Sequence, residues 1–205
     1  MQTANTQTLI ERASALLQDG TVSAVLGWKR GEFDYDMTPA VFTTEEELSA
    51  GFVYNDFCGA NLSKYMVKEN ANIETNKATV KTNNQMALQR DPNAAQAPIP
   101  QEKTLVFLKP CDTYSFNQLL KEHRIKRENV YVIGIPCVDF VQVPEGGSEA
   151  DAKPLEKCAT CKSTKHVVYD ELIGEEGDVK ESSRFDQVAE LEKMNPEERY
   201  NFWRN

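Results

Sequence analysis

Apolar and polar residues alternate along the chain in blocks that predict short helices and strands. Five apolar residues between positions 9 and 17 recur at spacings of three and four. We therefore expect an amphipathic helix over residues 7–19 that stops at Gly20. A short buried strand is expected at 22–28, and an edge strand at 40–42. Thr44 precedes three glutamates, a sequence that suits the start of a helix because its positive end attracts acidic side chains.

The middle of the chain loses this regular pattern. A helix is expected near residues 60–68, where apolar residues still recur. Residues 70–103 are rich in Asn, Gln, Ala and Thr, with three prolines between Asp91 and Gln101, and they show little sustained periodicity. This composition predicts a polar insertion or mobile loop, with a weak hairpin around residues 78–82.

The clearest unit lies between residues 104 and 137. Residues 105–108 are all apolar, as in a strand covered on both faces, and residues 130–135 form a second, β-branched run. Between them, Asp112 is expected to cap a helix that carries one stripe of residues, namely Phe116, Leu119, Leu120 and His123. Strand, helix and strand in this order predict a βαβ unit with parallel strands and a right-handed crossover.

The remainder predicts an acidic loop over 141–156, a short strand at 165–169 and a helix over 185–194. Asn195 followed by proline predicts a new helix start, and residues 195–205 are interpreted as the beginning of a truncated helix. Together the elements predict one α/β domain over residues 1–205. Its small mixed or parallel sheet should have flanking helices and a cysteine-lined loop at the carboxyl edge.

Charge and composition exclude several classes of function. The chain has 205 residues, a hydrophobic content of 40% and a net charge of −9, which argues against nucleic-acid binding. No apolar run approaches the roughly 20 residues of a membrane helix, so no membrane span is expected. The N-terminus lacks the basic and apolar parts of a signal peptide. We interpret the chain as cytoplasmic, where cysteine clusters indicate metal binding or catalysis rather than disulfides.

Four of the five cysteines are placed where one inorganic site could collect them. Cys111 and Cys137 each follow a predicted strand and a proline, and parallel strands end at the same edge of a sheet. Cys158 and Cys161 have the C-x-x-C spacing of zinc and iron–sulfur sites. A position beside the start of a helix is also expected to lower the thiol pKa of Cys111.

Spacing leaves three possible sites open. Zinc prefers two paired C-x-x-C arms, whereas only one arm is paired in this chain. Scattered ligands favour a [4Fe–4S] cluster on Cys111, Cys137, Cys158 and Cys161. Structural zinc in a non-catalytic adaptor of a redox complex is the alternative, and a dithiol redox pair at Cys158 and Cys161 is a third. Cys58 is expected to be a buried core residue.

Five blocks of sequence, in order, carry a resemblance to a known family. They are Val25-Leu-Gly-Trp-Lys29, residues 55–65, Leu108-Lys-Pro-Cys-Asp112, residues 131–137 and Lys157-Cys-Ala-Thr-Cys-Lys162. In these blocks the chain resembles the beta subunit of coenzyme F-420 hydrogenases and dehydrogenases. It is similar to relatives known as formate dehydrogenase or hydrogenase beta subunits. The resemblance covers most of residues 5–68 and 104–205.

The resemblance implies an oxidoreductase subunit that relays electrons between a [4Fe–4S] cluster and a flavin or a soluble hydride carrier. It places cluster ligation on the same four cysteines and implies FAD as a second cofactor. It also implies partner subunits of a hydrogenase, a formate dehydrogenase or a related complex. Such relatives continue into a ferredoxin-like segment beyond the equivalent of residue 205, so a ferredoxin-like domain or protein is an expected partner.

Candidate flavin contacts follow from the residues themselves. The sequence has no Gly-x-Gly-x-x-Gly fingerprint, so a Rossmann-type binding mode is not expected. Asn61, Ser63 and Lys64 open a predicted helix and could meet a phosphate or ribityl chain. Lys109 and Asp112 flank Cys111 and could contact the flavin ring or the cluster. No catalytic acid or base is assigned from the sequence.

Overall fold

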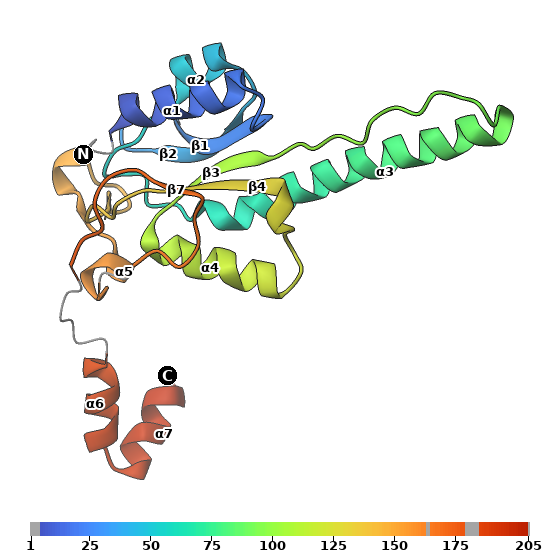
Figure 1. The fold of residues 1–205 in the computed structure, drawn as a ribbon. Coiled ribbons are helices and arrows are strands. Elements are labelled where there is room, and N and C mark those ends of the chain that lie inside the picture. Colours follow the sequence, from blue (N-terminus) through green and yellow to red (C-terminus); the bar gives the residue numbers. More distant parts are fainter. Residues whose placement is uncertain (1–4, 163–164, 179–184, 205) are drawn as a thin grey trace.

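A five-stranded mixed sheet forms the centre of the molecule (Figure 1). The computed structural model describes residues 5–162, 165–178 and 185–204. The strand order is β2-β1-β3-β4-β7. The strands are β1 (Ala24–Arg30), β2 (Met37–Phe42), β3 (Thr104–Leu108), β4 (Val130–Gly134) and β7 (Glu171–Leu172). The α/β class expected from the sequence is confirmed.

Strand direction brings four carboxyl ends to one edge of the sheet. β1, β3, β4 and β7 pair in parallel, and β2 alone runs antiparallel, as an edge strand beside β1. The β3–β4 register runs from Thr104 opposite Val130 to Leu108 opposite Gly134. All five residues of β3 are buried, as expected for a strand covered on both faces.

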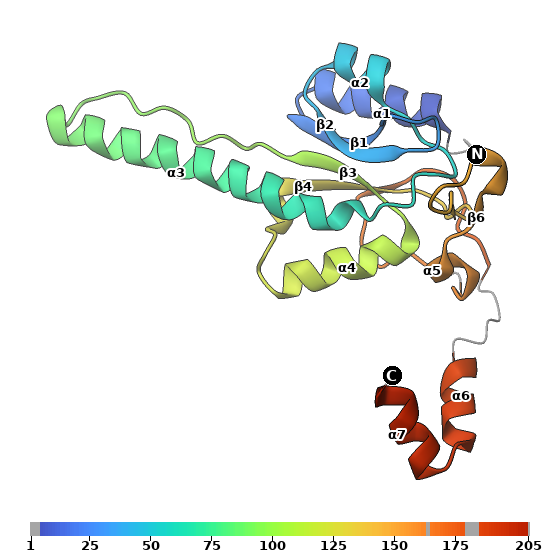
Figure 2. The same cartoon turned by 180° about the vertical axis from the view of Figure 1, so that it is seen from behind.

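Helices cover both faces of the sheet (Figures 1 and 2). α1 (Thr6–Gln18) and α2 (Glu45–Gly51) lie on one side. α4 (Pro110–Lys121) and the first turns of α3 (Met66–Arg90) lie on the other. The predicted cap at Thr44 is confirmed, because its side chain accepts a hydrogen bond from the Glu47 backbone N–H at 3.2 Å.

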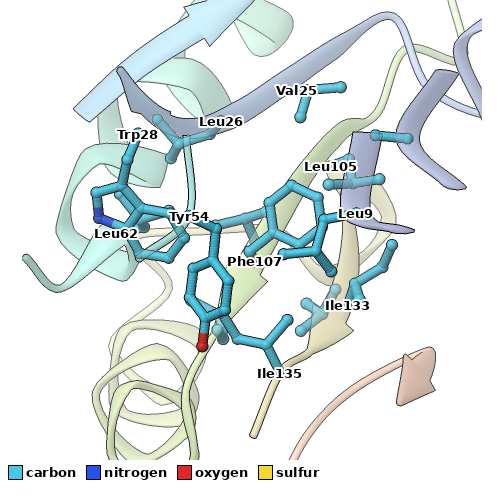
Figure 3. Close-up of a cluster of buried hydrophobic side chains, with 14 of the residues drawn as sticks. Leu9, Val25, Leu26, Trp28, Tyr54, Leu62, Leu105, Phe107, Ile133 and Ile135 are labelled. Carbon is cyan, nitrogen blue, oxygen red and sulfur yellow. The ribbon is translucent and has the colours of Figure 1, made fainter. Parts of the chain in front are cut away.

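The core packs against both faces of the sheet, with Leu9 of α1 on one side and Phe116 of α4 on the other (Figure 1). Figure 3 shows Leu9 of α1 facing Phe107 and Ile133 of the central strands. Phe107 also packs against Phe52, with ring centroids 5.2 Å apart. These side chains are almost wholly buried, so the carboxyl edge of the sheet stands on a rigid, close-packed base.

The loop and hairpin predicted within residues 70–103 are wrong for the first part of that range. A short 3₁₀ turn, η1 (Leu62–Tyr65), leads into the 25-residue helix α3, which projects beyond the sheet (Figure 2). Only Met66, Asn70 and Ile73 of α3 are buried, so most of this helix needs no apolar stripe and gives no periodic signal. Residues 66–90 contain neither glycine nor proline, which leaves helix formation unopposed.

Residues 91–103 contain no helix or strand, and they return beside α3 toward β3 (Figures 1 and 2). The Asn84 side chain ties the two segments together. It donates to the Ala97 carbonyl and accepts from the Ala97 N–H, each at 2.8 Å.

The start of α4 also differs from the prediction. The helix begins at Pro110, with Lys109 as the cap residue, because proline is favoured at the first helical position. Asp112 is therefore inside the first turn, where it forms an ion pair with Lys109 instead of capping the helix. His123 lies beyond the end of the helix with a φ of 56°, so it does not extend the apolar stripe.

The chain after β4 forms small elements around the carboxyl edge. They are β5 (Val141–Gln142), η3 (Glu149–Asp151), β6 (Lys153–Pro154) and α5 (Glu156–Ala159), and η2 (Arg127–Asn129) precedes β4. The strand predicted at 165–169 does not form, because the N–H groups of His166 and Val167 donate to the side chains of Glu176 and Thr113. Pairing with β4 begins only at Glu171.

Two helices, α6 (Asp186–Lys193) and α7 (Pro196–Arg204), end the described chain. The predicted cap at Asn195 is confirmed. Its side chain accepts from the Glu198 N–H at 3.0 Å, and its own N–H donates to the Glu198 carboxylate at 2.9 Å. Within the described residues, no helix combines the length and the apolar character that crossing a membrane requires.

Candidate metal centre at the carboxyl edge of the sheet

The structure brings together the four cysteines that the sequence singles out. They line one cavity of about 70 Å³, here called the cysteine cavity. The other residues of its wall are Lys109, Asp139, Phe140 and Lys157. Four thiols from three separate segments therefore surround one small space.

Three local structures place these thiols. Cys111 is the second residue of α4, directly after β3, and Cys137 follows β4 by three residues. The hydroxyl of Tyr54 donates to the Pro136 carbonyl at 3.1 Å and so fixes the chain beside Cys137. Cys158 belongs to α5, which is attached to the sheet edge through the Leu155 N–H donating to the Phe140 carbonyl at 2.9 Å.

A buried lysine stands at this cavity. The Lys109 side chain is 0% exposed. Its ammonium donates to the carbonyls of Cys58 at 3.1 Å and Ala60 at 2.8 Å. It also lies 4.9 Å from the ring centroids of Trp28 and Phe140. Carbonyl oxygens and aromatic faces therefore hold the Lys109 ammonium in place beside the cysteines.

Asp112 is the counter-ion of this lysine. Its Oδ2 atom lies 2.9 Å from Lys109 Nζ, and its side chain is 2% exposed. The Oδ2 atom accepts no hydrogen bond of regular geometry, so attraction between the two charges accounts for the contact. The Cys111 thiol donates to the other carboxylate oxygen, Oδ1, at 3.6 Å.

The thiols have raised pKa values, contrary to the expectation for Cys111. Burial raises the pKa of the Cys111 thiol to about 12, and the Asp112 carboxylate adds to this shift. Burial also raises the pKa of Cys137 to about 11, with further contributions from Cys158 and Cys161. Both residues line the cysteine cavity and are exposed by surface area. Burial and the carboxylate therefore outweigh the start of the helix.

No ready-made site for a single ion exists in the described parts of the chain. There, no three His, Cys, Asp or Glu side chains come close enough together to hold one metal ion. The four cysteines of the cavity wall are candidate ligands for either zinc or an iron–sulfur cluster.

A larger cleft adjoins the cysteine cavity. This aromatic cleft has a volume of about 890 Å³, and Lys157 lines both spaces. Its wall includes the rings of Phe33 and Tyr35, which stack with centroids 5.3 Å apart. The remaining walls are Asp36, Met37, Phe57, Gly59, Ala60, residues 141–147 and Leu155. Its size lies within the range of small-molecule and cofactor sites.

This cleft was not predicted from the sequence. Two signals could have indicated it, namely the aromatic residues within the polar segment after β1 and the pair Gly146-Gly147 in the acidic loop. Neither segment predicts a cleft alone, because the cleft exists only where the two segments face each other.

Three of the candidate flavin residues make local contacts instead. The Asn61 side chain accepts from the Ser63 N–H at 2.9 Å and donates to the Ser115 hydroxyl at 3.1 Å. The ammonium of Lys64 lies 4.9 Å from the ring centroid of its neighbour Tyr65. Neither cavity wall includes Asn61, Ser63 or Lys64. Of the five candidates, Lys109 lies on the cysteine cavity and Asp112 pairs with it.

Cys58 has the buried position expected of a core cysteine. It is 0% exposed, and burial raises its pKa to about 11. Its thiol donates to the Val53 carbonyl at 3.6 Å, and it is absent from the wall of the cysteine cavity. It therefore provides a natural control for the other four cysteines.

In comparisons with known proteins, no protein-family model matches the chain, and no curated protein is significantly similar to it. The resemblance described above therefore stays a prediction that rests on the five sequence blocks.

Proposed function

We propose that this chain is an electron-transfer module of an oxidoreductase that holds a [4Fe–4S] cluster on Cys111, Cys137, Cys158 and Cys161. The observation that carries the proposal is the meeting of these four thiols around one cavity. Thiolates are the ligands of such clusters. Only one pair of these cysteines has the C-x-x-C spacing, which favours a cluster over zinc, whose sites prefer two such pairs.

The two lysines of the cavity wall favour the thiolate form of Cys111, whereas burial and the Asp112 carboxylate oppose it. Four thiolates concentrate negative charge, and the ammonium groups of Lys109 and Lys157 both lower the pKa of Cys111 against the effect of burial. Because Lys109 is fully buried, its charge is poorly screened by solvent. Lys109 would thus stabilise the ligated, thiolate form of the site and help set its reduction potential.

The aromatic cleft supports a flavin as the second group of the proposed module. Phe33 and Tyr35 offer flat apolar surface, and no atom lies within 4 Å of the place where a side chain of Gly146 would begin. Lys157 stands on the boundary between cleft and cysteine cavity, where its ammonium donates to the Gly59 carbonyl at 2.8 Å. When bound, cluster and flavin would supply single-electron transfer and hydride transfer respectively.

The proposed setting is a larger cytoplasmic complex. The resemblance to hydrogenase and formate dehydrogenase beta subunits supports partner subunits and a ferredoxin-like domain or protein as the source or acceptor of electrons. In this chain the residues at the edge of the sheet would hold and orient the groups, and no residue is assigned as a general acid or base.

Purification without oxygen tests the proposal. The protein should be brown, contain iron and sulfide, and lose visible absorbance when dithionite is added. Added FAD should bind and lose its free fluorescence. A colourless protein with one zinc ion per chain would overturn the proposal in favour of a zinc-stabilised adaptor of a redox complex.

A further inference from the structure

His166 lies between the ends of the two strands that precede Cys111 and Cys137. Its side chain is 0% exposed. The Nε2 atom lies 3.2 Å from the Leu108 carbonyl oxygen and 3.1 Å from that of Ile135. Leu108 ends β3 three residues before Cys111, and Ile135 follows β4 two residues before Cys137. One ring nitrogen therefore contacts both strand ends, and it adds to the backbone hydrogen bond that the Ile135 N–H donates to the Leu108 carbonyl at 3.0 Å.

The other side of the ring faces a carboxylate. Nδ1 lies 2.9 Å from Glu176 Oε1, and the His166 backbone N–H donates to the same oxygen at 2.7 Å. The partners of both ring nitrogens are all acceptors. Carbonyl oxygens only accept hydrogen bonds, so the Nε2 atom that faces two of them carries the hydrogen.

The fold leaves a space shaped for this ring. A Cβ atom added to Gly134 of β4 would lie 3.0 Å from His166 Cδ2 and 2.9 Å from Leu172 Cδ1. Such contacts are closer than packed carbon atoms normally allow. Gly134 thus permits His166 to lie directly against β4.

The segment that carries His166 is also attached to α4. The Val167 N–H donates to the Thr113 hydroxyl at 3.1 Å, and that hydroxyl donates to the Pro110 carbonyl at 2.6 Å. Thr113 lies two residues after Cys111. His166 itself lies five residues after Cys161, so one short segment joins all three parts of the chain that supply the cysteines.

We propose that His166 is a positioning residue for the four-cysteine site. By donating to the carbonyls of Leu108 and Ile135 it keeps the two strand ends, and with them Cys111 and Cys137, at the separation that one shared group requires. Glu176 keeps the ring oriented with its Nε2–H toward the strands. His166 is not itself a ligand in this proposal, which rests on the proposed function only for the identity of the group bound.

The test uses the metal-free, reduced full-length chain and phenylarsine oxide, a trivalent arsenical that bridges two neighbouring thiols. Mass spectrometry of the digested protein measures the yield of the Cys111–Cys137 bridge. Loss of the two hydrogen bonds at Nε2 should lower this yield roughly tenfold in His166→Gly. Added imidazole should restore the yield by filling the vacated space. His123→Asn is the matched control, because it alters the other histidine at a positive φ that asparagine tolerates.

A second variant guards against a general loss of folding. Gly134→Ala retains the imidazole but displaces it, so it should also lower the bridge yield, while fluorescence of the buried Trp28 reports an intact core. An unchanged yield in His166→Gly would overturn the proposal, as would a reduced yield that imidazole does not restore while the core stays intact.

The two proposals fail in distinguishable ways. Absence of iron in the wild-type protein would contradict the cluster, whereas the arsenical yields test His166 without any metal. If iron is present, His166→Gln should shift the reduction potential of the site and accelerate iron loss to a chelator, and His123→Asn should leave both unchanged.

Discussion

The ammonium of Lys109 lies 2.9 Å from the carboxylate of Asp112, and both side chains are withdrawn from solvent beside the cysteine cavity. This pair occupies the turn between β3 and α4, with Cys111 between its two members in the sequence. Burying two charges is costly unless each compensates the other. The pair therefore links the stability of the fold to the electrostatics of the site.

Removing one member of this pair should be strongly destabilising. Asp112→Asn leaves the Lys109 cation buried without its counter-ion, so we expect a loss of about 3 kcal/mol in the free energy of unfolding. Urea denaturation followed by Trp28 fluorescence measures this loss. The exposed pair Arg30 and Asp34, 3.0 Å apart, gives the control. Asp34→Asn should cost less than about 1 kcal/mol, and equal losses in the two variants would contradict the account.

The raised thiol pKa values predict slow alkylation of the metal-free protein. With pKa values of about 12 for Cys111 and about 11 for Cys137, few thiolates exist at neutral pH although reagents can reach the rim. The alkylation rate of Cys111 in iodoacetamide should therefore keep rising well above pH 9. Asp112→Asn should increase that rate at a given pH, because the carboxylate contributes to the raised pKa. Saturation near pH 8.5 would contradict this prediction.

The sequence predicted the meeting of the cysteines better than it predicted their surroundings. β3 and β4 are short apolar runs, and parallel pairing places their ends, and thus Cys111 and Cys137, at one edge whatever the loops do. The burial of Lys109 was not predictable, because lysine is normally a surface residue and the groups that enclose it, such as the carbonyls of Cys58 and Ala60, come from distant segments. Helix α3 was missed because an exposed helix has no apolar stripe.

The aromatic cleft is a second feature that could not be predicted from the sequence. Phe33 and residues 141–147 are far apart in the sequence, and nothing local in either segment indicates that they face each other. Loop packing of this kind depends on the whole fold rather than on periodicity. Asn61 and Ser63 show the converse, because the Asn61 side-chain oxygen accepts hydrogen bonds from the N–H and hydroxyl of Ser63 within the same turn.

The lowered pKa of Glu74 predicts that acid weakens the packing near the start of α3. Hydrogen bonds from Asn129 and Lys126 lower its pKa from 4.5 to about 2. A depressed carboxyl pKa stabilises the fold above pH 4.5, and that contribution disappears as the pH falls toward 2. Because the side chain is partly solvated, Glu74→Gln should cost about 1 kcal/mol at pH 7. The difference from wild type should vanish near pH 2.

Thermal or urea unfolding at several pH values measures this effect. Glu190→Gln, at an exposed position on α6, is the control and should leave the pH profile unchanged. A Glu74 variant whose deficit persists unchanged at low pH would show that the ion pairs are not its cause.

The stacked rings at the aromatic cleft predict the strength of flavin binding. Phe33 is 51% exposed, so its replacement should disturb the fold little. If the flavin lies against these rings, Phe33→Ala should weaken FAD binding roughly tenfold through loss of an aromatic contact. Flavin fluorescence titration measures the dissociation constant. Phe185→Ala removes another exposed ring outside the cleft and should have no effect. Equal affinity for both variants would place the flavin elsewhere.

Iron and sulfide content of two cysteine variants, purified without oxygen, tests the central claim most directly. Cys137 lies on the cysteine cavity, whereas Cys58 is buried in the core away from it. We predict that wild type and Cys58→Ala retain equal iron and acid-labile sulfide, with about four of each per chain, and that Cys137→Ala loses both. Loss of iron from Cys58→Ala with retention in Cys137→Ala would contradict the assignment of the four ligands.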